Sequence, residues 1–70
     1  MNTESIGKNA GIVWRVLNDR KSTWEELVKS SGLKPLEIAA AIGWLAREDK
    51  INMSIQDGLM SFDVYHECYY

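Results

Sequence analysis

Residues 51–64, INMSIQDGLMSFDV, alternate apolar with polar side chains on both sides of Asp57-Gly58. Such alternation is typical of strands with one buried face, and Asp-Gly is typical of a two-residue hairpin turn. The stretch therefore predicts two antiparallel strands, at residues 51–56 and 59–64. The predicted register pairs Gln56 with Leu59, Ile55 with Met60, Ser54 with Ser61, Met53 with Phe62, Asn52 with Asp63 and Ile51 with Val64. A slip of one residue would move polar side chains onto the apolar face, so the register is strongly specified.

A helix is expected directly before this hairpin. Its apolar stripe recurs at helical spacing and consists of Ile38, Ile42 and Leu45. Pro35 suits the first turn of a helix, because its missing N–H would have no partner there. Asp49 tolerates the left-handed conformation that stops a helix. The sequence therefore predicts a helix from Pro35 to about Glu48.

The preceding residues predict a shorter helix. Thr23 and Glu26 have the spacing of a capping box, in which the threonine hydroxyl accepts a free amide and the glutamate reaches back to the cap. The inner face of this helix is formed by Trp24, Leu27 and Val28. Gly32 suits the left-handed position that ends a helix. About two helical turns are expected between the two signals.

The first helix is expected from about Ser5 to Asn18. Its apolar positions at helical spacing are Ile6, Ala10, Val13 and Leu17. Gly7 and Gly11 lie one turn apart on it, and glycine weakens a helix interior. Either another backbone packs closely against these glycines or the helix simply has irregular propensity. The sequence leaves both interpretations open.

Two short helices joined by a glycine-containing turn, with a hairpin after them, indicate a winged helix-turn-helix. The predicted fold class is α+β, with three helices followed by a two-stranded β-hairpin wing. The third helix takes the recognition position. Residues 1–70 are expected to form a single domain of this kind.

Two segments allow a comparison with one particular family of winged-helix proteins. They are residues 6–17, IGKNAGIVWRVL, and residues 43–51, GWLAREDKI. They resemble the signature segments of a family of small, stand-alone bacterial winged-helix proteins of unknown function. The resemblance extends over nearly the whole chain. It implies the winged-helix fold and a regulatory or DNA-binding role, and it brings no known ligand and no functional residue.

The composition of the chain favours a soluble cytoplasmic protein. Cys68 is the only cysteine, so no disulfide forms within the chain, and a lone thiol fits a reducing compartment. No apolar run approaches the roughly 18 residues that span a bilayer. The first residues, MNTES, lack the basic and then apolar order of a signal peptide. We therefore expect neither a membrane segment nor a targeting segment.

DNA binding is the first function that the fold and the resemblance suggest. The residues expected to contact double-stranded DNA are Lys29, Lys34, Arg47 and Lys50, with Lys21 as a further candidate. The charge pattern opposes this function, because the net charge is −2 and residues 51–70 contain three acidic residues and no basic one. The expected wing tip, residues 56–59, offers no cation to a phosphate.

A protein-interaction or self-association module that does not bind DNA appreciably is the alternative function. Steps of 100° per residue leave a small, apolar face pointing outward on the third helix. The predicted partner or homodimer face consists of Leu36, Ala40, Gly43, Trp44, Tyr65 and Tyr69. An indole beside small residues favours contact with a second copy or another protein. The charged run AREDK is locally neutral and indicates a solvated helix end with paired charges.

We expect no enzyme, cofactor, metal site or small-molecule substrate. His66 and Cys68 are possible metal ligands, whereas a structural zinc site needs about four. No phosphate loop or nucleophile motif is present. The last residues, 64–70, are unusually aromatic. Either the last strand continues through them and packs, across a dimer for example, or the end of the chain is disordered.

Overall fold

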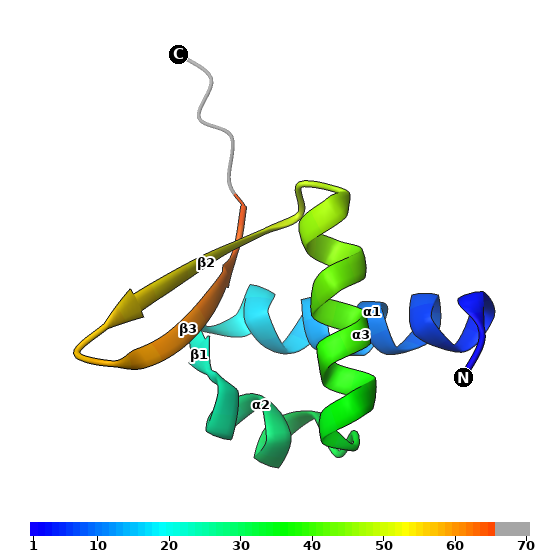
Figure 1. Ribbon diagram of the computed structural model, residues 1–70, viewed down its shortest axis with the longest axis horizontal. Helices are drawn as coiled ribbons and strands as arrows, with labels where there is room; N and C mark the ends of the chain where they lie inside the picture. The colour runs from blue at the N-terminus through cyan, green and yellow to red at the C-terminus, as the bar shows by residue number, and fades with distance from the viewer. Residues whose placement is uncertain (66–70) are drawn as a thin grey trace.

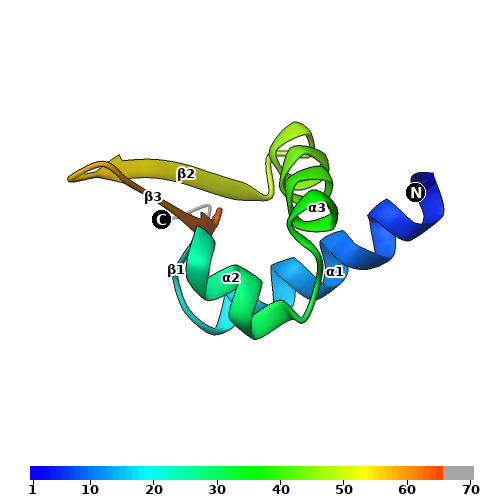
Figure 2. The ribbon, with the colours of Figure 1, turned by 60° about the horizontal axis from the view of Figure 1, so that its bottom comes forward.

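The computed structural model in Figure 1 describes residues 1–65. Its elements, in chain order, are α1 (Thr3–Asp19), β1 (Ser22–Thr23), α2 (Trp24–Ser31), α3 (Pro35–Arg47), β2 (Ile51–Gln56) and β3 (Leu59–Val64). In Figures 1 and 2 the helices form one body, from which the β2–β3 hairpin projects. This arrangement confirms the predicted three helices and wing.

The helix ends follow from capping residues. The Thr23 N–H donates to a carboxylate oxygen of Glu26 at 2.9 Å, and the Glu26 N–H donates to the Thr23 hydroxyl at 3.2 Å, so the predicted capping box is present. Gly32 ends α2 with φ 72°. Helix α1 begins earlier than expected, because Asn2 accepts the Ser5 N–H at 2.9 Å and caps it.

Helix α3 begins and ends almost as the sequence predicts. Pro35 is its first residue and Arg47 its last, with Glu48 as the C-terminal cap. A carboxylate oxygen of Glu37 accepts the Lys34 N–H at 2.9 Å and satisfies one of the free amides at the start of the helix. Asp49 takes φ 55°, which is the predicted left-handed stop.

The sheet contains one strand more than the sequence predicts. The β2–β3 register is the predicted one at all six pairs, from Ile51 opposite Val64 to Gln56 opposite Leu59. Strand β1 adds to the outside of β3, so the strand order is β1-β3-β2. Two residues are too few to show a periodicity, which explains why β1 has no signal in the sequence.

The core lies where α1, α3 and the base of the sheet meet. Its buried side chains are Ala10, Val13, Leu17, Leu27, Ile38, Ala41, Ile42, Leu45, Ile51, Phe62 and Val64. Of the residues in the predicted helix stripes, three are only partly buried, namely Ile6, Trp24 and Val28, and the others belong to this core. None of the helices within residues 1–65 is both long enough and apolar enough to cross a membrane.

Candidate functional site

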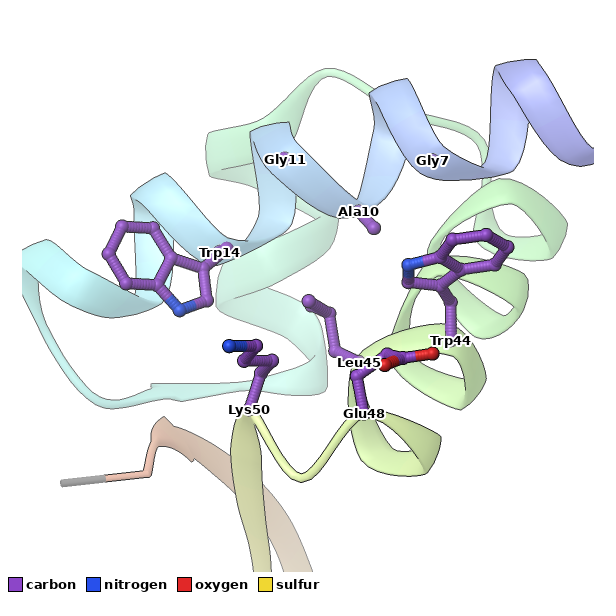
Figure 3. A pocket seen from close by; sticks show the side chains of 8 residues that line it. All are labelled: Gly7, Ala10, Gly11, Trp14, Trp44, Leu45, Glu48 and Lys50. Carbon is purple, nitrogen blue, oxygen red and sulfur yellow. The ribbon is translucent and has the colours of Figure 1, made fainter. Parts of the chain in front are cut away.

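A surface groove of about 330 Å³ runs between α1 and the C-terminal part of α3. Figure 3 shows the side chains around it. Helix α1 contributes Gly7, Ala10, Gly11 and Trp14, and the segment from α3 to the start of β2 contributes Trp44, Leu45, Glu48 and Lys50. The lining is mostly apolar, with one acidic and one basic side chain.

The floor of the groove is made of small and buried residues. Ala10 and Leu45 belong to the hydrophobic core and separate the two sides in Figure 3. A Cβ atom placed on Gly7 or Gly11 would meet no atom within 4 Å. No backbone of the described residues packs closely on these glycines, so close packing within the chain does not explain them.

Two indoles form the walls. Trp14 is 37% exposed and Trp44 is 39% exposed, and in Figure 3 they stand on opposite sides of the groove. Large aromatic side chains usually bury most of their surface and are enriched at protein interfaces when they do not. The sequence predicted an exposed role for Trp44 but not for Trp14. The signal for Trp14 was its place three residues after Gly11, on the same face of the helix.

The charged rim of the groove is solvated rather than paired. The ion pairs within residues 1–65 are Lys8 with Glu4, at 3.6 Å, and Arg20 with Glu26, at 2.8 Å. Neither involves the AREDK run at residues 46–50, so the prediction of paired charges there is wrong. All four charged side chains of that run are exposed.

The predicted DNA-contacting cations lie at the two ends of α3. Lys34 caps its N-terminus and Arg47 is its last residue, which places them roughly 20 Å apart along the helix. Lys29 is in the last turn of α2, and Lys50 lines the groove beyond the other end of α3. All four are exposed, and Lys34 and Arg47 are separated by the length of α3.

The predicted partner face is divided between two surfaces. Trp44 turns into the groove, whereas Leu36, 70% exposed, and Gly43 lie outside it. Ala40 is only half-exposed. Tyr65 is 48% exposed, and its N–H donates to the Lys50 carbonyl at 2.8 Å just after β3 ends. Tyr69 lies outside the described residues, as do His66 and Cys68.

The outer half of the wing exposes apolar side chains that the sequence predicted to be on the buried face. Met53 is 54% exposed, Ile55 67% and Met60 43%, although they share a sheet face with the buried Phe62. The hairpin extends beyond the helices, which leaves the Ile55–Met60 pair near its tip exposed. Met53 is exposed on the edge strand β2, although it lies directly opposite Phe62. Within residues 1–65, no three His, Cys, Asp or Glu side chains come together as a metal site would need.

Comparison with known proteins shows which family this chain resembles. Residues 1–64 match the family described as winged helix-turn-helix domain (DUF2582). The chain belongs to this family. A DUF2582-like fold is also seen in the solution NMR structure of protein BT2368 from Bacteroides thetaiotaomicron. That protein is 35% identical, with a TM-score of 0.83 over 91% of this chain and 79% of the other. A search of curated proteins found no match.

Family membership confirms the resemblance expected from the sequence. The DUF2582 family defines a winged-helix fold, with which a DNA-binding or regulatory role is compatible, and it assigns no activity. The function therefore has to be argued from the surfaces of this chain.

Proposed function

We propose that this DUF2582 domain is a non-catalytic, cytoplasmic regulatory module that acts through protein contact or self-association rather than by reading DNA. The main support is the contrast between its exposed apolar side chains and its sparse cations on the surfaces that a winged helix turns to DNA. This proposal favours the second of the two functions expected from the sequence.

Helix α3 offers little to a base edge. Direct readout uses Arg, Lys, Asn or Gln side chains near the start of the recognition helix. Between Lys34 and Arg47 the exposed residues of α3 are Pro35, Leu36, Ala39, Gly43 and Trp44. Lys34 is the one cation available at the helix start, so base contacts would have to come from a single flexible side chain.

The wing offers little to a phosphate. Residues 51–65 contain no Lys or Arg, and their charges are those of Asp57, at the turn, and Asp63. Phosphate contacts supply most of the affinity of a protein for DNA, and they come from cations and backbone amides. A carboxylate at the tip of the wing repels the DNA backbone.

Apolar surface is plentiful by comparison. The two indoles of the groove and the apolar side chains of the outer wing are large hydrophobic groups exposed to solvent. Their burial against a partner would stabilise a small protein. Trp is also among the residues that contribute most to protein–protein affinity. These surfaces favour a protein as the partner.

The test is fluorescence anisotropy of a labelled mixed-sequence DNA duplex, titrated with the protein at about 50 mM and about 200 mM salt. We expect no saturable binding at either salt concentration. Binding that weakens steeply with salt, and that Lys34→Ala reduces while the charge-matched control Lys8→Ala does not, would overturn the proposal. Lys8 suits the control because it lies on α1, paired with Glu4.

Binding to double-stranded DNA is the second candidate. It is favoured by the winged-helix family and by the position of Lys34 at the N-terminus of α3, where a helix dipole also attracts anions. The same titration decides between the two functions.

A further inference from the structure

We propose that the groove between α1 and α3 is filled by a second copy of this chain. The two copies meet through antiparallel α1 helices, and Trp14 of each copy enters the groove of the other. This inference rests on the proposed function and names the partner of one of its surfaces.

The groove and the side chain that would fill it lie on one surface. On α1, Gly7, Gly11 and Trp14 follow one another at the i, i+4, i+7 positions of a single helix face. Two antiparallel helices that cross between Ala10 and Gly11 bring residue 14 of each opposite residue 7 of the other. The groove of each copy therefore receives the projecting indole of the other copy, which is the self-complementarity that a two-fold dimer requires.

The size of the groove suits this occupant. Its volume is about 330 Å³, and its floor at Gly7 and Gly11 is open. A small ligand would stay largely exposed there, whereas small-molecule sites usually enclose about 70–90% of the ligand surface. A bulky side chain carried in by a helix is covered by its own backbone, so an open groove is sufficient for it.

The charges at the rim are also complementary to those of a second copy. In Figure 3 Lys50 lies on the Trp14 side of the groove and Glu48 on the Trp44 side. When Trp14 of one copy approaches Trp44 of the other, Lys50 of the first copy approaches Glu48 of the second. Two such contacts form by symmetry, and neither charge is held in an ion pair within the described part of the chain.

The decisive experiment is the molar mass by sedimentation equilibrium of the wild type and of Gly11→Leu, over about 5–500 μM protein, a range that brackets the micromolar affinities common for small interfaces. We expect a wild-type dimer and at least a tenfold weaker association of Gly11→Leu. The variant should fold, because a Cβ atom added at Gly11 meets no neighbouring atom within 4 Å and Gly11 lines the open groove.

Gly43→Leu is the matched control. Gly43 is also a helical glycine with nothing within 4 Å of an added Cβ, but it lies outside the groove. We expect it to leave the dimer intact. A second variant, Trp14→Ala, removes the side chain that fills the groove and should weaken association even if Gly11→Leu proves difficult to fold.

A wild type that stays monomeric up to about 500 μM would overturn the inference. So would a dimer that Gly43→Leu dissociates and Gly11→Leu and Trp14→Ala do not, since the interface would then be the outer face of α3. A monomer that also fails to bind DNA leaves the proposed function standing without this inference. A wild-type dimer that binds DNA with a steep salt dependence would support this inference and overturn the proposed function.

Discussion

Among residues 1–65, four take positive φ, and each of them ends a helix or turns the wing. They are Gly32, Asp49, Asp57 and Gly58. The Asp57-Gly58 pair has φ values of 52° and 78°, as a type I′ hairpin turn requires at both central residues. A residue with a Cβ atom is sterically strained in this region, and the strain is smaller for aspartate than for most residues.

Replacement of glycine by alanine should therefore have opposite effects on stability at two exposed positions. We expect Gly58→Ala to lower the free energy of unfolding by about 1 kcal/mol, because alanine is strained at positive φ. Gly43→Ala should raise it by up to about 1 kcal/mol, because alanine is the better helix former. Urea denaturation at one low protein concentration measures both. A gain in stability for Gly58→Ala would contradict the turn conformation.

Glu26 makes the start of α2 sensitive to acid. The Thr23 N–H donates to its carboxylate, which lowers the pKa of Glu26 below its ordinary value, with smaller contributions from the Thr23 hydroxyl and Arg20. A lowered folded-state pKa stabilises the protein above the unfolded-state pKa, and this stabilisation is lost as the pH falls through the folded-state pKa. Carboxyl NMR titration should therefore give a Glu26 pKa below 4.5.

A matched variant tests the cause of that shift. Thr23→Ala removes the hydroxyl but keeps the N–H that contributes most, so the pKa of Glu26 should rise only part of the way to its ordinary value. Loss of this N-cap should also cost about 1 kcal/mol of stability. A full return of the pKa would show that the hydroxyl, rather than the backbone amide, holds the carboxylate in its charged form.

The wing is one element with two environments. Its base is pinned on both sides of β3, by β1 and β2, and its apolar face packs on the helices through Ile51, Phe62 and Val64. Its outer half is a two-stranded ribbon whose apolar side chains are largely exposed, with Ile55 at 67% and Met60 at 43%. A ribbon of this kind is only marginally stable without further packing.

Truncation on the same face of the wing should therefore have unequal effects. Phe62→Ala, at a position 2% exposed, should cost about 3–5 kcal/mol and leave much of the protein unfolded. Ile55→Ala, at a position 67% exposed, should change stability by less than about 0.5 kcal/mol in the monomer. Urea denaturation of both variants checks this. A large loss for Ile55→Ala would show that the outer wing is covered in solution.

A chain of 70 residues has a small core for its surface, so association matters for the stability of the whole molecule. The buried side chains come from every helix and from the base of the wing, yet large apolar groups remain exposed in the groove and on the outer wing. A partner that covers such groups stabilises the folded state by mass action.

If a second copy covers the groove, thermal stability should depend on protein concentration. We expect the midpoint of unfolding of the wild type to rise by several degrees between about 5 and 500 μM, because only the folded chain dimerises. Gly11→Leu should show little dependence over the same range. Differential scanning calorimetry measures both curves, and parallel behaviour of the two proteins would argue against the groove as the interface.

The sequence by itself determined the elements and the register of the wing. Capping residues, the Pro35 start and the Asp57-Gly58 turn act over three or four neighbours, so they can be recognised without knowledge of the fold. The hydrophobic stripes likewise predicted most of the core. Strand β1 was missed because a two-residue pairing depends on where β3 lies and leaves no pattern of its own.

Only the tertiary structure decided which apolar residues stay exposed. Alternation in the wing is identical for Phe62 and Ile55, and the difference in their burial arises from how far the hairpin extends beyond the helices. The groove depends in the same way on how α1 crosses α3, which brings Trp14 and Trp44 to one hollow from positions 30 residues apart in the chain. Contacts between distant segments are set by packing of the whole chain, and local sequence patterns do not encode them.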